Sequence, residues 1–384
     1  MRICLVYDCL FPWTVGGAER WYRNLGQRLA ADGHEVTYLT LRQWDSGVDA
    51  SYAGVRVSPV GPRMALYVGA RRRILPPLVF GAGVFWHLLR NGRRYDVVHT
   101  ASFPYFSLLA AGLLRRPAGY ELVVDWHEVW SRGYWRDYLG ATGGAVGHAI
   151  QTLCVRLHQH AFCFSRLHRD RLLSAGLRGE VTILEGEYSG ELVPTEPVAT
   201  EPVVVFAGRH IPEKRAAAVP PAVAAARAHV PNLRGIVFGD GPDRPVVLEA
   251  IRAAGLEGVV DAPGFVDAGE VASALRSALC MLLPSSREGY GLVVVEAAAR
   301  GTPSVVVRGE DNAAVELIDD GENGVVSPSA EPEDLAAAIV RVHEDGEALR
   351  ARTRDWFARN APRLSLENSL ELVSASYAER SARA

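Results

Sequence analysis

Residues 279–301 read LCMLLPSSREGYGLVVVEAAARG and decide the fold class. The apolar run 280–283, closed by Pro284, is typical of the end of a buried strand. The Ser, Gly and Tyr residues of 285–291 predict a loop. Good helix formers followed by glycine predict a helix over 292–300. This strand–loop–helix order is the repeating unit of an α/β domain with a parallel sheet.

The predicted helix start has the chemistry of an anion site. Backbone amides at a helix start lack helical partners and lie at the positive end of the helix dipole. Here those amides belong to Gly289, Tyr290, Gly291 and Leu292. Glu288 precedes them in the loop, and Glu296 lies about one turn inside the helix. Two carboxylates beside an anion site suggest a ligand with a phosphate and several hydroxyls, such as a nucleotide sugar.

Outward from this stretch, strands and helices alternate along nearly the whole chain. Apolar runs predict strands at 2–7, 34–41, 95–99, 121–125, 161–165, 203–207, 234–238, 259–262 and 304–307, with helices near 18–32, 103–114, 145–160, 215–229, 245–254 and 268–277. A Pro-, Thr- and Glu-rich linker at 191–202 separates the two halves. We therefore predict an α/β protein with two doubly wound Rossmann-like domains facing across a cleft, comprising residues 1–190 and 203–364. An amphipathic C-terminal segment, 365–384, is expected to pack back on the first domain.

Composition narrows the class of protein. The 384 residues carry a net charge of −3, so no global basic field favours nucleic acid. Five scattered cysteines without a CxxC motif argue against a disulfide framework or a zinc site and favour reduced thiols. The N-terminus reads as a first strand rather than a signal peptide, and no apolar run reaches about 18 residues. We expect a cytoplasmic protein without a metal site.

Lys214 is the only lysine in a chain that otherwise uses arginine. Together with Arg209 it follows a predicted strand of the second domain. Breaking a sugar–phosphate bond leaves a charged diphosphate, which fixed cations stabilise. The sequence offers no convincing aspartate pair in a strand-end loop to hold a metal, so these two side chains are the candidate phosphate ligands. The alternative for Lys214 is a solvated surface lysine.

Two further candidates lie at strand ends in the first domain. Gly16 and Gly17 follow the first strand, where glycine lets backbone approach a phosphate; an ordinary βα turn explains them equally well. His127 follows the strand 121–125, and we favour it over His99, whose position suits a core histidine. The aromatic residues around His127 suit either sugar stacking or core packing. They are Trp126, Trp130, Tyr134, Trp135 and Tyr138.

The apolar stretch 69–95 is flanked by arginines at both ends. Such a segment suits contact with an anionic membrane or a lipid-linked acceptor. The other interpretation, which we favour from sequence, is a helix buried against the sheet with solvated ends.

The second half resembles the retaining glycosyltransferase family 4, of GT-B architecture. The matching segments are GRHIPEK at 208–214, GDGP at 239–242, PGFVD at 263–267, SREGYGLVVVEAAARGTP at 286–303 and AVELIDDGENGVVSP at 314–328. The first half matches more loosely, at VGGAER (15–20) and LAADGHEVTYLT (29–40). The most specific element is the pair of glutamates, Glu288 and Glu296, in its loop-then-helix context. One departure is Arg215, where the family usually has glycine.

The resemblance implies roles for individual residues. Glu288 would face the donor sugar and Glu296 would hold the ribose hydroxyls. His127 would contact the donor sugar near the reaction centre, or alternatively the phosphate or the acceptor. Gly264, Phe265 and Val266 would border the nucleobase, mostly through backbone.

These implications lead to one expected function and two alternatives. We expect a metal-independent retaining hexosyltransferase that uses a nucleotide-diphosphate sugar, UDP- or GDP-linked, as donor substrate and needs no cofactor. The acceptor would be a small molecule, a glycan or a lipid-linked molecule, with weak peripheral membrane contact allowed. The alternatives are another GT-B sugar-nucleotide enzyme, such as an epimerase, and a catalytically silent partner subunit.

Overall fold

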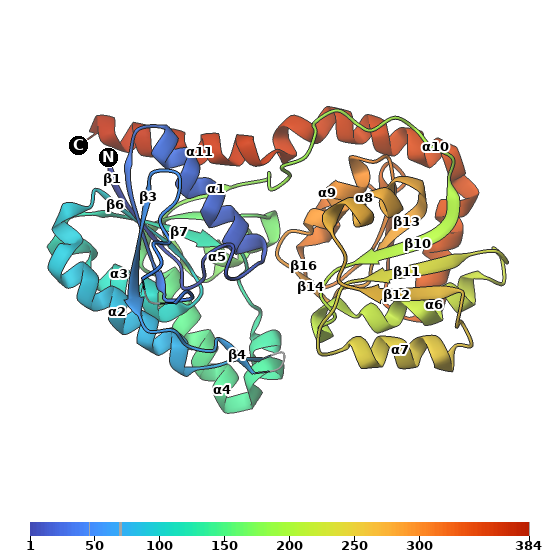
Figure 1. Ribbon diagram of the computed structural model, residues 1–384, viewed down its shortest axis with the longest axis horizontal. Helices are drawn as coiled ribbons and strands as arrows, with labels where there is room; N and C mark the ends of the chain where they lie inside the picture. Colours follow the sequence, from blue (N-terminus) through green and yellow to red (C-terminus); the bar gives the residue numbers. More distant parts are fainter. Residues whose placement is uncertain (46, 69–70, 384) are drawn as a thin grey trace. The chain divides into compact units, whose positions relative to one another are not determined.

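The computed structural model describes residues 1–45, 47–68 and 71–383, which divide into two compact units (Figure 1). Unit 1 comprises residues 1–184 together with the chain from residue 369 onward. Unit 2 comprises residues 185–368. Each unit has its own parallel sheet with helices packed against it, which confirms the expected fold class of two Rossmann-like units.

The described part of unit 1 contains a seven-stranded sheet in which every pair of neighbouring strands is parallel. In spatial order its strands are β3 (Val55–Gly61), β2 (Glu35–Leu41), β1 (Arg2–Val6), β6 (Val97–Ala101), β7 (Glu121–Trp126), β8 (His158–Cys163) and β9 (Arg178–Ile183). The central strands read as continuous apolar runs because both faces of a parallel sheet are covered by helices. Strand order reverses between β1 and β6, so ligands are expected outside the carboxyl ends of these strands.

Helices complete unit 1. They are α1 (Gly17–Ala31), α2 (Leu75–Asn91), the 3-10 turn η1 (Gly92–Arg94), α3 (Tyr105–Ala118), α4 (Arg132–Val155), α5 (Arg166–Ser174) and the C-terminal α11 (Leu366–Arg383). A short antiparallel hairpin joins β4 (Tyr67–Val68) to β5 (Arg71–Arg72). Within unit 1, the Tyr377 hydroxyl of α11 lies 2.5 Å from Nδ1 of His99, and Ser374 donates to Asp32 over 2.9 Å. These bonds attach α11 to the first sheet and to α1.

Unit 2 repeats the plan with six parallel strands in its described main sheet. In spatial order they are β12 (Val260–Gly264), β11 (Arg234–Phe238), β10 (Glu201–Ala207), β13 (Ala278–Leu283), β15 (Ser304–Val307) and β17 (Gly324–Ser327). Strand order reverses between β10 and β13. A second, two-stranded parallel pair, β14 (Arg287–Glu288) with β16 (Asp311–Asn312), lies just beyond the ends of β13 and β15 in the chain.

The helical elements of unit 2 vary widely in length. They are the 3-10 turns η2 (Pro212–Lys214) and η3 (Ala216–Ala218), α6 (Val219–Ala226), α7 (Arg244–Ala253), α8 (Ala268–Ser277), α9 (Leu292–Ala298), the 3-10 turn η4 (Ala313–Leu317) and α10 (Pro332–Leu364). Helix α10 packs on α6 and β17 and buries Leu335, Ile339 and Val342 in the core. One continuous apolar core therefore fixes the strand ends that carry the candidate site.

Two predicted helices begin elsewhere than expected, and one observed helix was not predicted. The helix predicted near 145–160 is the second part of α4, which is interrupted at Gly140 (φ +76°) and begins at Arg132, capped by Ser131, whose hydroxyl accepts from the Tyr134 amide. The helix predicted from 215 begins at Val219, because Arg215 adopts a left-handed conformation with φ +47°. Helix α10 was not anticipated, although Pro332 at its first turn, followed by two acidic residues, is a recognisable start signal.

Candidate functional site

Two loops of unit 2 meet at the point where strand order reverses. The loop after β10 carries Lys214, and the loop after β13 carries Glu288. The ammonium of Lys214 lies 2.6 Å and 2.7 Å from the two carboxylate oxygens of Glu288. The Glu288 side chain is only 8% exposed and that of Lys214 23% exposed. The two residues that the sequence singled out thus form one mostly buried ion pair.

Further bonds join the same two loops. The backbone amide of Ser286 donates to the carbonyl oxygen of Glu213 over 2.8 Å. The Arg287 guanidinium lies 3.3 Å from the Glu213 carboxylate. Glu213–Lys214 and Ser286–Glu288 are therefore held together by two neighbouring ion pairs and a backbone bond. Geometry of this kind positions Lys214 and Glu288 before any ligand arrives.

Asn312, which sequence reasoning missed, supports Glu288 from the other side. It is the strand partner of Glu288 in the β14–β16 pair and is 3% exposed. Its side-chain amide donates to the carbonyls of Ser285 and Val307, at 3.1 Å and 2.8 Å, and its oxygen accepts from the Ala314 amide. The only sequence signal was its position just before the segment 314–328, because a lone asparagine has no recognisable spacing.

The helix predicted over 292–300 begins at Leu292 as expected and ends two residues earlier, at Ala298. Helix α9 begins at Leu292, so Gly289 and Tyr290 lie in the loop and Gly291 caps the helix. Gly291 has φ +103°, and a Cβ there would lie 2.5 Å from the Cβ of Ala314, so this glycine is required by the backbone and by packing. The Tyr290 ring is buried, and its hydroxyl donates to the carbonyl of Glu185 over 2.5 Å. Only its backbone remains a candidate ligand group.

Arg209 differs from Lys214 in being exposed. Within the part of the chain that the structure describes, its guanidinium forms no ion pair. Arg215, one residue after Lys214, is one of two described non-glycine residues with positive φ, at +47°. The preference for glycine here in the resembling family therefore has a conformational cause, since a side chain in this region is strained.

His210 follows Arg209 in the sequence and was not predicted as functional. Its side chain is fully buried. Neither of its ring nitrogens has a hydrogen-bond partner. Its backbone joins two strand-end loops: its amide donates to the Asp240 carbonyl over 2.8 Å, and its carbonyl accepts from the Asp243 amide over 2.9 Å. Burial lowers the pKa of His210, and the Phe238 carbonyl opposes this shift. The ring is therefore a neutral, unsatisfied polar group next to the loop GDGP.

The remaining predicted ligand residues of unit 2 lie on neighbouring elements. Glu296 is half-buried in α9, and the Arg300 guanidinium donates to its backbone carbonyl over 2.6 Å. Val266 is half-buried after β12, next to Phe265, whose side chain is 83% exposed. Both lie in segments that follow carboxyl ends of strands, at the same edge as Lys214.

In unit 1, Gly16 caps α1 and Gly17 is its first residue. Gly16 has extended backbone that any residue adopts, and a Cβ on Gly17 would meet nothing within 4 Å. Neither the backbone conformation nor packing requires Gly17. Because Gly17 has no structural requirement, close approach of a ligand to the start of α1 is a possible reason for a glycine at this position.

A buried carboxylate links that helix to the strand of His127. Asp125, fully buried in β7, accepts from the indole of Trp21 in α1 over 2.7 Å and lies 2.8 Å from Nε2 of His99. Burial raises the pKa of Asp125, but His99, His127 and Trp21 outweigh it and hold the pKa below its ordinary value. His99, bonded to Tyr377 on its other nitrogen, is a core residue.

His127 itself is half-buried at the end of β7. Its ring stacks on Phe164 with centroids 4.6 Å apart, and its Nε2 has no hydrogen-bond partner. Burial lowers its pKa, Asp125 raises it, and His99 lowers it further, so that the net pKa lies below the ordinary value. The ring is therefore neutral at pH 7, and its Nε2 is a buried polar atom without a partner.

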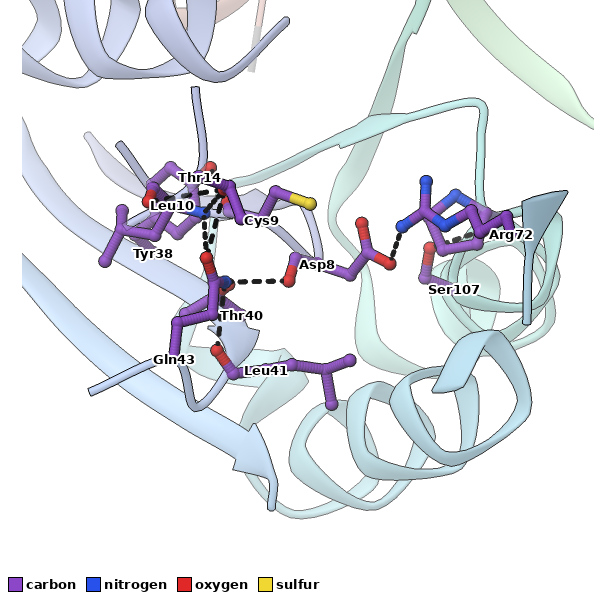
Figure 2. Close-up of polar contacts among 11 residues, drawn as sticks. Asp8, Cys9, Leu10, Thr14, Tyr38, Thr40, Leu41, Gln43, Arg72 and Ser107 are labelled. Atoms are coloured by element: carbon purple, nitrogen blue, oxygen red, sulfur yellow. Dashed lines mark hydrogen bonds and ion pairs between the residues drawn. The ribbon is translucent and has the colours of Figure 1, made fainter. Parts of the chain in front are cut away.

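The loop after β1 is held by a polar network that sequence reasoning did not anticipate (Figure 2). The Gln43 amide donates to the Asp8 carbonyl over 3.0 Å, while its oxygen accepts from the Leu10 amide and the Thr14 hydroxyl. The fully buried Asp8 carboxylate pairs with the guanidinium of Arg72, from the β4–β5 hairpin. This pair fixes the hairpin to the end of the central strand.

The aromatic residues after His127 divide between the two roles considered. Trp126 and Trp135 are core residues. Trp130, Tyr134 and Tyr138 are half-buried and contact one another, with ring centroids between 4.8 and 6.0 Å apart. Phe103 stacks on Trp130, and the Arg72 guanidinium lies 4.9 Å from the Phe103 ring. A surface for sugar stacking is therefore confined to these half-buried rings.

No group of three or more His, Cys, Asp or Glu side chains is arranged to hold a metal ion in residues 1–45, 47–68 and 71–383. Within the same residues, no helix combines the length and apolar character needed to cross a bilayer. All five cysteines are free and buried.

Comparison with known proteins agrees with this architecture. Residues 193–362 match the family model "Glycosyl transferases group 1", and residues 16–185 match "Glycosyl transferase 4-like domain". The chain is 26% identical to a glycogen synthase of Mycobacterium tuberculosis over 376 residues, covering 92% of this chain and 89% of that protein.

Solved structures show the same fold. Sucrose-phosphate synthase from Thermosynechococcus elongatus superposes with a TM-score of 0.77 at 20% identity and full coverage of both chains. HepE of Anabaena, solved in complex with UDP, gives a TM-score of 0.74 at 20% identity, covering 99% of this chain and 100% of that one.

Proposed function

The chain belongs to the group 1 glycosyltransferases of GT-B architecture and transfers a sugar from a nucleotide sugar, and we propose that it does so with retention and without a metal. The observation that carries the proposal is the Lys214–Glu288 pair at the strand-order reversal of unit 2. It joins the cation that suits a phosphate to the carboxylate that suits sugar hydroxyls.

The donor diphosphate is assigned to Arg209, Lys214 and the loop at Gly289–Leu292. Arg209 is exposed and has no described ion-pair partner, so its charge is available to a ligand. Lys214 shares its charge with Glu288 until a diphosphate competes for it. These cations would stabilise the negative charge that develops on the leaving group, which is the service a metal supplies elsewhere.

The sugar and nucleoside are assigned to the carboxylates. Glu288, held by Lys214 and Asn312, would accept hydrogen bonds from the transferred sugar. Glu296 would accept from the ribose hydroxyls, and Val266 would border the base through its backbone. The Anabaena relative of known structure binds UDP, so uridine is the first base to test.

In unit 1, Gly16 and Gly17 would approach the diphosphate through backbone, and the neutral His127 would hydrogen-bond the donor sugar. In the transfer step, the bond between the anomeric carbon and the diphosphate oxygen breaks. The acceptor oxygen then bonds to the same face of that carbon. Its proton passes to the departing diphosphate oxygen, so no enzyme nucleophile is needed. The acceptor itself would be a small molecule, a glycan or a lipid-linked molecule.

Donor hydrolysis tests this proposal. The protein is incubated with UDP-, GDP- and dTDP-sugars, with and without a chelator, and released nucleotide and sugar anomer are followed by NMR. We expect slow release of nucleotide with retained anomer, unaffected by the chelator. An epimerised donor would support the epimerase alternative. Neither turnover nor nucleotide binding would support a silent subunit.

Arg209→Ala provides the sharpest variant, because the side chain is exposed and unpaired within the described chain. We expect about a tenfold or larger loss of UDP affinity, since a charge-assisted hydrogen bond contributes about 1.5–3 kcal/mol, with no change in unfolding. The matched control is Arg252→Ala on α7, also exposed. Equal UDP affinity in both variants would remove Arg209 from the phosphate site.

A further inference from the structure

Helix α2 of unit 1 leaves a long apolar face uncovered. Residues 74–89 contain no Asp, Glu, Lys or Arg. Five large apolar side chains are between 42% and 69% exposed: Ile74, Leu75, Leu78, Trp86 and Leu89. At about 100° of rotation per residue, they occupy one arc of about 120° on the helix surface. A surface helix of a globular unit normally places polar residues there.

The buried side chains of α2 lie on the opposite side of the helix. Phe80, Val84 and Leu88 are buried, and α2 packs along α3. Two glycines allow the close approach: a Cβ on Gly81 would lie 2.6 Å from the Phe106 Cβ of α3, and one on Gly83 would lie 1.9 Å from the Val60 carbonyl of β3. The interpretation favoured from sequence, a buried helix, is therefore right for one side of α2 and wrong for the other.

The segment that carries this face has charged side chains of one sign only. Residues 50–95 contain eight arginines and no Asp or Glu. Arg63 pairs with Asp45, and Arg72 with Asp8. By contrast, Arg73, Arg90 and Arg93, at the two ends of α2, form no ion pair with any residue that the structure describes. The Arg90 guanidinium lies 5.3 Å from the Trp86 ring, at the border of the apolar arc.

We propose that unit 1 binds an anionic phospholipid surface through the exposed face of α2, with Arg73, Arg90 and Arg93 contacting lipid phosphates. An apolar arc bordered by cations and a tryptophan is the pattern of a helix lying in the membrane interface. A second copy of the chain fits less well, because a twofold contact through α2 would bring the arginines of the two copies together. The inference goes beyond sugar transfer and does not depend on the donor site.

Vesicle flotation tests the proposal with the full chain. The vesicles are phosphatidylcholine alone or phosphatidylcholine mixed with phosphatidylglycerol. We expect wild-type protein to float with the mixed vesicles and to bind the neutral ones far less. The double variant Trp86→Ser, Leu89→Ser should bind at least about tenfold more weakly, since both side chains lose their apolar burial in lipid. The matched control is Leu173→Ser on α5, an apolar residue of similar exposure.

The arginines are tested separately. Arg90→Gln with Arg93→Gln should weaken binding to mixed vesicles by about fivefold per arginine, as expected for cations near an anionic surface. Arg178→Gln, on an exposed position of β9, should have no effect.

Two results would overturn the proposal. One is the absence of binding to mixed vesicles. The other is equal binding by the Trp86/Leu89 double variant and the Leu173 control. Sedimentation of the free protein distinguishes a second copy: a dimer lost on Trp86→Ser, without vesicle binding, assigns the face to self-association. UDP binding by every variant is measured in parallel and should equal wild type, so failure of the donor-site assignment is seen independently.

Discussion

The two units present their candidate groups in opposite ways. In unit 2, Lys214 and Glu288 neutralise each other, and neighbouring bonds join the loops that carry them. In unit 1, the charge lies beneath the surface on Asp125, and the candidate group above it, His127, is neutral with one unpartnered nitrogen. The Lys214–Glu288 pair of unit 2 is held by its own charges, whereas His127 of unit 1 lies beside groups that no ligand need touch.

Because of this difference, substitutions in the two units should affect activity and stability differently. Removing either charge of the Lys214–Glu288 pair in unit 2 also removes a structural contact, so loss of activity and loss of stability come together at these two residues. Removing His127 from unit 1 leaves the Asp125 network intact, so activity is lost with little effect on folding.

Lys214→Ala should lower the free energy of unfolding by roughly 3 kcal/mol, because it leaves the buried Glu288 carboxylate without a partner. Urea unfolding measures the loss. The double variant Lys214→Ala, Glu288→Gln should recover most of the stability while remaining inactive, since the uncompensated charge is gone. In unit 1, His127→Gln should cost far less than Lys214→Ala. Similar losses for the two single variants would remove the contrast between the units.

Gly291→Ala in unit 2 should destabilise by about 2–4 kcal/mol, combining left-handed backbone strain with overlap on Ala314. Gly17→Ala in unit 1 should leave unfolding within about 0.5 kcal/mol of wild type, because the added Cβ meets nothing. We nevertheless expect Gly17→Ala to weaken UDP binding if backbone there approaches phosphate. Thermal unfolding and nucleotide titration of the same two variants separate the effects.

His210→Leu should stabilise unit 2 by about 1–2 kcal/mol at neutral pH, because it replaces a buried ring with two unsatisfied nitrogens. The folded-state pKa of His210 is lowered by burial, so the unfolded chain binds the proton more readily. Stability from the neutral ring is thus complete above the unfolded pKa of about 6.5 and is lost as pH falls. The advantage of His210→Leu should therefore grow on acidification, measured as melting temperature against pH. A constant advantage would contradict the assignment of a neutral, buried ring.

Arg215→Gly gives the smallest expected change. Arg215 adopts φ +47°, where a side chain costs about 1 kcal/mol relative to glycine, offset in part by the greater entropy of unfolded glycine. We expect stabilisation by a few tenths to about 1 kcal/mol in urea unfolding. UDP affinity should not change, since Lys214 keeps its pairing with Glu288. A loss of stability would mean that Arg215 makes a contact worth more than its strain.

Much of the candidate site followed from local sequence, for identifiable reasons. Glu288, Lys214 and Arg209 lie in strand-end loops, and strand ends are readable from apolar runs closed by Pro or Gly. The helix over 268–277 has the predicted bounds, since Asp267 supplies a cap that accepts from two backbone amides. Asn312, His210 and Asp8 were not recognised, because their partners lie on segments distant in the sequence and leave no periodic trace in the chain.

Three properties could be predicted from the sequence: the class of fold, the strand-end positions of the candidate residues and the family. Apolar periodicity and glycine or proline at strand ends are local properties. They can be read from the sequence without knowing which segments pack together. Tertiary structure decided which charges meet, that Lys214 pairs with Glu288, and that Gly291 but not Gly17 is sterically required. It also decided that α2 is buried on one side only. These outcomes depend on contacts between distant segments, which a linear pattern does not encode.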